Sequence, residues 1–333
     1  MPIRIPDTLP ATGILESENI FVMTEYRAIH QDIRPLRVLI LNLMPTKIET
    51  ETLILRKLSN SPLQVDIELL RTDSNSFDNQ MEHMRDFYVT LDEIRNKHYD
   101  GMIVTGSPVK TQSFEEVDFW PELCEIFDWA KEHVFSTFYI SWSAQAGIYH
   151  HYGIQNHQLP EKKLGIFPHH VVKHSSPLVR GVNDLVWAPR AQTAFISAAD
   201  IEAHPELEPI IVGGRDSLAN FKELAGANNA NDDVYIAKST DSRHFFVFGH
   251  PEYEADTLAL QYQRDLEAGN EAAMPRNYFP GDDPTAKPCA VWRSDAQLIY
   301  TNWLNYYVYQ ATPYDIDSLT MGFPNKDNGR FLF

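Results

Sequence analysis

Three apolar runs, separated by helix-like stretches, constrain the fold of this chain more than any other feature. They lie at residues 36–43, 101–108 and 135–140, and the second ends in a tight glycine turn. An apolar run without alternation is typical of a strand covered on both faces, and strands joined through helices form a parallel sheet. The sequence therefore predicts an α/β fold with a mostly parallel sheet and flanking helices. Because ligands collect at the carboxyl ends of such strands, the residues that follow the three runs are expected to face one crevice.

Other segments have the periodicity of further elements. Residues 64–70 alternate between apolar and polar side chains, which predicts a strand near the edge of the sheet. After residue 153 the pattern is less regular and predicts only short strands. A turn and helix are expected at 44–58, helices at 120–133 and 294–310, and short strands at 165–172, 210–213, 234–237 and 245–248.

Ser141 lies where the third apolar run stops abruptly before small, helix-like residues. A strand that turns sharply into a helix exposes its corner side chain and points the unpaired N–H groups of the helix at a ligand. Such a corner suits a nucleophile. The G-x-S-x-G pattern is absent, since Tyr139 and Ser143 stand where its glycines would be. This corner alone therefore leaves two readings open, a catalytic serine and a buried structural serine.

His250 and Glu252 follow the last of the short predicted strands. A histidine that acts as a base and a carboxylate that orients it are the partners that a nucleophile needs. The alternative reading is a surface turn with a solvated histidine.

The composition excludes several classes of protein. The net charge of −18 disfavours nucleic acid and anionic membranes as partners, because their phosphates would be repelled. No apolar run approaches the roughly 18 residues that span a bilayer, and residues 1–4 do not begin a secretion signal, so a cytoplasmic protein is expected. Two cysteines are too few for a disulfide framework. The 13 histidines show no ligand spacing such as H-E-x-x-H, so no bound metal is expected.

The length of 333 residues suits one large domain with appended segments, and no linker divides it. We expect an N-terminal arm at 1–34 that packs on the core, one α/β domain at 35–316 and a tail at 317–333. Small, polar residues without apolar periodicity predict a surface insertion at about 213–233.

Several blocks of the sequence carry a family resemblance. They are residues 1–4, 19–24, 31–36, 40–45, 249–253 and 302–309. These blocks resemble the homoserine O-acyltransferases of methionine biosynthesis, the succinyltransferases and acetyltransferases with a class I glutamine-amidotransferase-like fold. The match runs from residue 1 to about residue 316. It implies that fold, with an N-terminal arm and a C-terminal helical extension, and acyl transfer from coenzyme A to the hydroxyl group of homoserine.

The resemblance also implies a catalytic apparatus. The family forms an acyl-enzyme on a cysteine, whose position is occupied by Ser141 here, and its catalytic histidine and glutamate correspond to His250 and Glu252. The implied oxyanion donors are the N–H of Trp142 and an N–H from the Leu43-Met44 pair, with Leu43 as the expected donor.

The implied substrate contacts fall on Lys162 and on Arg264, whose guanidinium can hold a carboxylate in a bidentate grip. Acyl-CoA is the implied co-substrate, and no other cofactor is expected. The expected partners are these small molecules and a second copy of the chain in a homodimer.

The chain also departs from the family pattern beyond Ser141. Arg190-Ala191-Gln192 replaces a His-Ser-Arg sequence, so a substrate-contacting serine is lost at Ala191, together with the arginine beside it. Pro168 replaces a glutamate. At the position of Lys110 the family has a glycine or a glutamate, which determines whether the acyl donor is succinyl or acetyl. Together with the insertion, these changes favour natural divergence.

Two functions are consistent with these residues. In the first, Ser141 takes the acyl group from acyl-CoA and passes it to homoserine or a related hydroxy amino acid such as serine. A serine can do this with His250 as its general base, as serine triads do. In the second, the chain is a catalytically silent relative that binds a ligand or a partner, since several site positions have changed. The intact His250 and Glu252 argue against that reading.

The donor and the acceptor are the least determined features. The Lys110 ammonium could meet the free carboxylate of a succinyl group, or it could lie near the phosphates of coenzyme A, and both readings stay open. The changes at Ala191 and Gln192 remove contacts on the acceptor side, which predicts an altered preference for homoserine.

Overall fold

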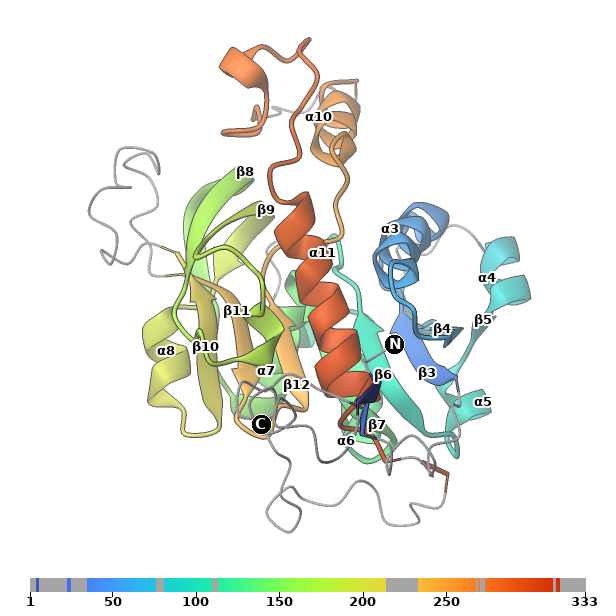
Figure 1. Cartoon of the computed structure of the whole chain (residues 1–333). Helices are drawn as coiled ribbons and strands as arrows, with labels where there is room; N and C mark the ends of the chain where they lie inside the picture. Colours follow the sequence, from blue (N-terminus) through green and yellow to red (C-terminus); the bar gives the residue numbers. More distant parts are fainter. Residues whose placement is uncertain are drawn as a thin grey trace.

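A computed structural model describes residues 4–5, 23–24, 35–75, 81–109, 113–213, 233–267, 269, 273–313 and 316–317. Its centre is a ten-stranded sheet (Figure 1). In spatial order the strands are β5 (Tyr88–Val89), β4 (Val65–Leu70), β3 (Leu36–Leu41), β6 (Tyr99–Val104), β7 (Val134–Ile140), β12 (His244–Val247), β11 (Val234–Ser239), β10 (Leu207–Val212), β8 (His157–Val171) and β9 (Leu185–Phe195).

The sheet has a parallel half and an antiparallel half. All five pairings from β5 to β12 are parallel. The four pairings from β12 to β9 are antiparallel. The prediction of a mostly parallel sheet is therefore confirmed. The strand β9 was not predicted, because Pro189 and Arg190 interrupt its apolar pattern, and β8 is longer than its predicted span.

Helices cover both faces of the sheet, with α11 in front and α6 behind it in Figure 1. One apolar cluster joins the sheet to the helices behind it and the other joins it to those in front. The first group is α5 (Leu91–Ile94), α6 (Trp120–His133), α7 (Trp142–Tyr152) and α8 (Ala198–Ala203). The second group is α3 (Lys47–Ser59), η2 (Pro177–Val179), α11 (Arg293–Asn302) and the π-helical turn η5 (Trp303–Tyr309).

The central strand β3 shows why the apolar runs are continuous. Leu39 and Leu41 belong to the cluster on one face, and Val38 and Ile40 belong to the cluster on the other. All four side chains are fully buried. A strand between two helical layers has no solvent face, so its sequence does not alternate.

A third apolar cluster places the C-terminal part of the chain beside the antiparallel half of the sheet. It joins Leu164 and Ile166 of β8 to Leu258 of α10 (Thr257–Glu267) and to Trp292 at the start of α11. This packing holds α10 next to the ends of the strands, where Figure 1 shows it above β8 and β9. The remaining elements are α4 (Met81–Phe87), η1 (Phe114–Glu116), η4 (Pro280–Asp282) and the paired β1 (Arg4–Ile5) and β2 (Met23–Thr24).

The predicted helices at 44–58, 120–133 and 294–310 are confirmed as α3, α6 and the continuous α11 and η5. Most of the arm and of the tail, and residues 214–232 of the insertion, lie outside the described residues. Among the helices that are described, none is both long enough and apolar enough to cross a membrane.

Candidate active site

Ser141 lies at a sharp corner between β7 and α7. Its backbone has φ 55° and ψ −115°, a conformation that residues other than glycine rarely adopt. The Ser141 N–H donates to the carbonyl of Val247 in β12 at 2.7 Å, which ties the corner to the sheet. Ser141 makes no side-chain cap to the helix that it precedes, although capping is the usual structural role of a serine there. The corner is thus a strained turn of the kind that presents a nucleophile.

His250 and Glu252 form a buried pair. The His250 Nδ1 lies 2.7 Å from the Glu252 Oε1, and the two residues are 7% and 6% exposed. With Nδ1–H donating to the carboxylate, Nε2 is the nitrogen that can act as a base. The alternative reading of a solvated surface histidine is wrong, because both side chains are enclosed.

Two further contacts hold the His250 ring. The backbone N–H of His250 donates to the carbonyl of Pro189 in β9 at 3.0 Å. The ring of Tyr253 stacks on the imidazole, with centroids 4.2 Å apart and planes inclined by 12°. The pKa of Tyr253 is raised well above its usual value, first by burial and then by Glu252 and Glu49, so its hydroxyl stays protonated.

A cavity of about 430 Å³ brings most of the predicted residues together. This volume is within the usual range for small-molecule sites. Gly106 borders the narrow space between Ser141 and His250, because a Cβ on it would lie 3.5 Å from the Cβ of Ser141 and 3.6 Å from the Cε1 of His250. In this structure the side chains of Ser141 and His250, both described, are not hydrogen-bonded to each other. The predicted residues that line the cavity are Ser141, Trp142, Lys162, Ala191, His250, Glu252 and Arg264.

The backbone donors differ in what they bind. Within the described residues, the N–H of Trp142 has no acceptor, as expected of an oxyanion donor in the first turn of a helix. The N–H of Leu43 instead donates to Thr105 Oγ1 at 2.8 Å. The N–H of Met44 donates to Asn42 Oδ1 at 3.1 Å. The prediction for Leu43 therefore needs correction, because Thr105 already accepts its hydrogen bond.

The substrate-binding candidates occupy the outer part of the cavity. Arg264 lies on α10, with an Nη2 atom 3.5 Å from the Glu49 carboxylate of α3. Lys162 and Ala191 line the cavity from β8 and β9. Lys110 lies outside the described residues, so both of its readings stay predictions.

The two substituted neighbours of Ala191 have different surroundings. Arg190 is fully buried and donates to Asp233 Oδ2 at 2.5 Å and to the carbonyl of Val234 at 3.0 Å. Gln192 lines the cavity, yet neither polar atom of its buried amide has a partner. Arg190 therefore serves the packing of the sheet, while Gln192 places a neutral amide in the cavity wall.

Sequence reasoning missed several contributors to this site. Thr105 and Gly106 were only expected to face the crevice, and Glu49 and Tyr253 were not singled out. Tyr253 directly follows the predicted pair, so its proximity could have been inferred, whereas Glu49 is brought to the cavity only by the packing of α3. Among the described residues, no group of three or more histidine, cysteine, aspartate or glutamate side chains could hold a metal ion.

Comparison with known proteins identifies the family. A family model described as homoserine O-succinyltransferase matches residues 2–314. The chain belongs to the homoserine O-succinyltransferase family. One relative, the homoserine O-acetyltransferase of Acetivibrio thermocellus, is 50% identical over 96% of this chain and 100% of its own length. Another, the homoserine O-succinyltransferase of Shewanella piezotolerans, is 47% identical over 96% of this chain and 97% of its own length.

The fold of this homoserine O-succinyltransferase family member also has a counterpart among solved structures. A glutamine amidotransferase from Thermotoga maritima is 12% identical, with a TM-score of 0.50 over 83% of this chain and 99% of that chain. The similarity concerns the fold alone and confirms the expected glutamine-amidotransferase-like architecture.

Proposed function

We propose that this protein is an acyl-CoA-dependent homoserine O-acyltransferase that works through an acyl-enzyme on Ser141. The observation that carries the proposal is the strained Ser141 corner, which shares a cavity with the buried His250 and Glu252 pair. Membership of the family supports homoserine as the acceptor, because relatives named for both acetyl and succinyl transfer to homoserine match nearly the whole chain. The proposal covers both donors.

The first half-reaction loads the enzyme. The Ser141 hydroxyl attacks the thioester carbonyl while His250 Nε2 takes its proton, and the Trp142 N–H donates to the developing oxyanion. The C–S bond then breaks, and His250 returns the proton to the thiolate, which leaves as free coenzyme A. Glu252 stabilises the imidazolium that exists between these steps.

The second half-reaction transfers the acyl group from Ser141 to homoserine. The homoserine hydroxyl attacks the Ser141 ester, His250 takes the hydroxyl proton, and the C–O bond to Ser141 breaks as His250 protonates the serine oxygen. An ester replaces an ester, so this step is nearly neutral in free energy, whereas the loading step from a thioester is downhill. We therefore expect unloading to limit the rate.

Among the described residues, the geometry of the site favours catalysis over the catalytically silent alternative. A protein that only bound a ligand would gain nothing from the strained corner at Ser141, which costs about 1–3 kcal/mol. The buried His250 and Glu252 pair is likewise retained. We propose a cytoplasmic location, which is supported by two free cysteines, Cys124 and Cys289, and by the need for acyl-CoA.

A homodimer is also part of the proposal. Large apolar side chains are exposed at Ile48 on α3 and at Met81 and Phe87 on α4. The two helices are linked by the His83 ring, whose Nε2 lies 2.9 Å from the Glu51 carboxylate. A second copy that covered these side chains would bury them. Light scattering after size exclusion should give twice the monomer mass, and a purely monomeric sample would rule the dimer out.

Intact-mass spectrometry tests the nucleophile directly. Incubation with acetyl-CoA or succinyl-CoA should add one acyl group to the protein, and homoserine should then remove it as the O-acyl product. The Ser141→Ala variant should stay unmodified and inactive, while Ser141→Cys should again be acylated. Turnover by Ser141→Ala at the wild-type rate would refute the mechanism.

A further inference from the structure

An ion pair joins two helices at the cavity. Glu49 lies in the first turn of α3 and Arg264 in the last turn of α10, and both line the cavity that contains Ser141. The Glu49 Oε1 and an Arg264 Nη2 are 3.5 Å apart. This separation exceeds that of a normal hydrogen bond, so the two charges attract each other without being locked together.

The pair lies near the catalytic histidine. Glu49 and Arg264 line the same cavity as Tyr253. The ring of Tyr253 in turn stacks on the imidazole of His250 at 4.2 Å. A ligand held by the pair therefore lies in the cavity that also contains His250.

The pair is also accessible. The Glu49 side chain is 39% exposed and that of Arg264 is 53% exposed. An exposed, loosely paired carboxylate and guanidinium contribute little to stability by themselves. Each of the two side chains can therefore leave the other and bind a ligand that carries both charges, at little cost in free energy.

We infer that Glu49 binds the ammonium group of the amino-acid acceptor while Arg264 binds its carboxylate. The inference rests on the proposed function and assigns a specificity role to Glu49. The charged groups of an α-amino acid lie about as far apart as those of an ion pair, so the four groups form a square of alternating charge. Both substrate charges then gain a partner, and neither protein charge loses one.

This assignment also distinguishes the two substrates. The phosphates of coenzyme A would be attracted to Arg264 but repelled by Glu49, whereas a zwitterion gains from both. Hydroxy acids without an ammonium group would satisfy only Arg264. The Glu49 carboxylate thus makes the site select amino acids among hydroxyl compounds.

Other carboxylates that line the cavity provide the contrast. Glu252 is already bound to His250 at 2.7 Å. Asp265 lines the cavity next to Arg264 in sequence, but within the described residues it makes no ion pair. Asp265→Asn is therefore the matched control, because it removes the same charge from the same cavity without touching the pair.

The test compares homoserine with 4-hydroxybutyrate, which lacks only the ammonium group. In Glu49→Gln, kcat/KM for homoserine should fall at least 10-fold, because a hydrogen bond to a charged group is worth about 1.5–3 kcal/mol. The value for 4-hydroxybutyrate should stay the same, as should kcat/KM for acyl-CoA and the rate of Ser141 acylation. Asp265→Asn should keep the wild-type preference for homoserine.

Three results would overturn the inference. They are equal losses for both acceptors in Glu49→Gln, a lowered kcat/KM for acyl-CoA in that variant, and loss of the preference in Asp265→Asn instead. Titration calorimetry with homoserine gives a readout that needs no turnover. Weaker binding to Glu49→Gln would support the assignment even if wild-type Ser141 were never acylated, and unchanged binding would refute it while leaving acylation untouched.

Discussion

At the scale of single residues, the backbone of Ser141 makes a prediction about stability. Its φ of 55° and ψ of −115° cost about 1–3 kcal/mol in any residue with a Cβ, and glycine avoids this strain. This stabilisation is reduced by about 0.5–1 kcal/mol, because glycine has a larger conformational entropy in the unfolded chain. We expect the free energy of unfolding of Ser141→Gly to be about 1 kcal/mol higher than that of Ser141→Ala, as measured by urea denaturation.

Ser141→Ala is the control for this comparison, since it also removes the hydroxyl but keeps the Cβ. Both variants should be inactive. Equal stabilities would mean that the corner at Ser141 is relaxed in solution, and a strained nucleophile would then no longer support the proposed function.

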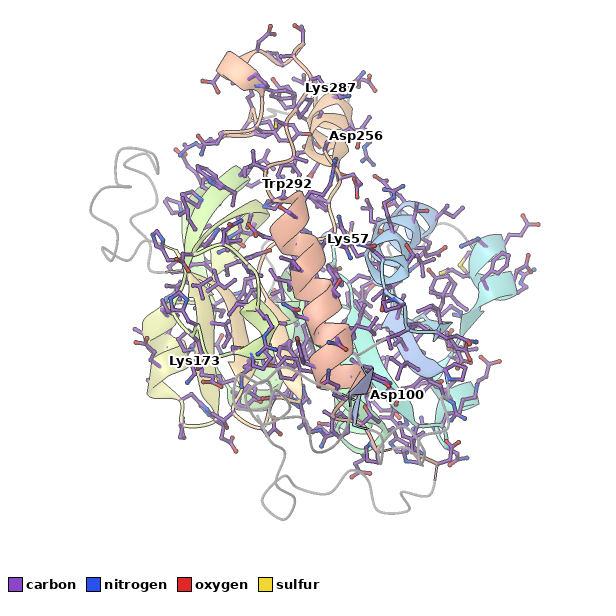
Figure 2. All side chains as sticks on the ribbon, viewed as in Figure 1. Lys57, Asp100, Lys173, Asp256, Lys287 and Trp292 are labelled. Atoms are coloured by element: carbon purple, nitrogen blue, oxygen red, sulfur yellow. The ribbon has the colours of Figure 1, made fainter. Side chains whose placement is uncertain are left out.

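At the scale of elements, the segment that carries His250 and Glu252 is clamped between α3 and α11. The carboxylate of Glu254 lies 3.2 Å from the ammonium group of Lys57, which is buried on α3. The Trp292 indole donates to the carbonyl of Tyr253 at 3.0 Å. Figure 2 shows Lys57 on α3 beside α11 and Trp292 at the start of α11. The segment with His250 and Glu252 is therefore held from both sides.

Removing the carboxylate at Glu254 should loosen this clamp. Glu254→Gln leaves the Lys57 ammonium buried without a counter-charge, and an uncompensated buried charge costs about 3 kcal/mol. We expect a lower unfolding free energy, together with a lower kcat because Glu252 is only two residues away. The double variant Lys57→Met/Glu254→Gln should recover much of the stability in a double-mutant cycle. Additive losses would show that the pair is not coupled.

At the scale of the whole molecule, a buried charge cluster joins the strands of the antiparallel half. Asp233, at the start of β11, accepts hydrogen bonds from Lys163 of β8 at 2.8 Å and from Arg190 of β9 at 2.5 Å. Burial alone would raise the pKa of Asp233, but the two cations outweigh it and hold the pKa well below its usual range. This half of the sheet thus depends on an ionised aspartate.

The depressed pKa of Asp233 determines how the stability of the fold changes at acid pH. A depressed carboxylate pKa stabilises the folded state above the unfolded-state value of about 3.9, and this contribution is lost as the pH falls below it. Asp233→Asn should be less stable than the wild type by about 3 kcal/mol at pH 7, because two cations stay buried. The difference should be constant from neutral pH down to about pH 5 and should shrink as the pH falls below about 4, toward the depressed folded-state pKa of Asp233, in urea titrations. A difference that does not vary with pH would refute the linkage.

The sequence alone predicted β3, β4, β6, β7 and β12 of the parallel half of the sheet, but not the two-residue β5 at its edge. Continuous apolar runs such as that of β3 can only be buried between two layers. A histidine two residues before a glutamate at the end of a strand indicated a catalytic pair, with a solvated surface turn as the alternative. The antiparallel half was predicted less well, because β9 interrupts its apolar pattern with Pro189 and with Arg190, whose charge is neutralised by a distant aspartate. The local periodicity of the sequence does not show that a distant carboxylate will pair with a buried arginine.

Tertiary structure decided what depends on contacts between distant segments. The donation of the Leu43 N–H to Thr105, 62 residues away, removed a predicted oxyanion donor, and the approach of α3 to α10 placed Glu49 beside Arg264. The strain at Ser141 likewise arises because β7 and α7 are both fixed by packing, so the corner between them has no freedom to relax. Side-chain identity specifies which chemistry is available, but only the packed chain specifies which groups meet.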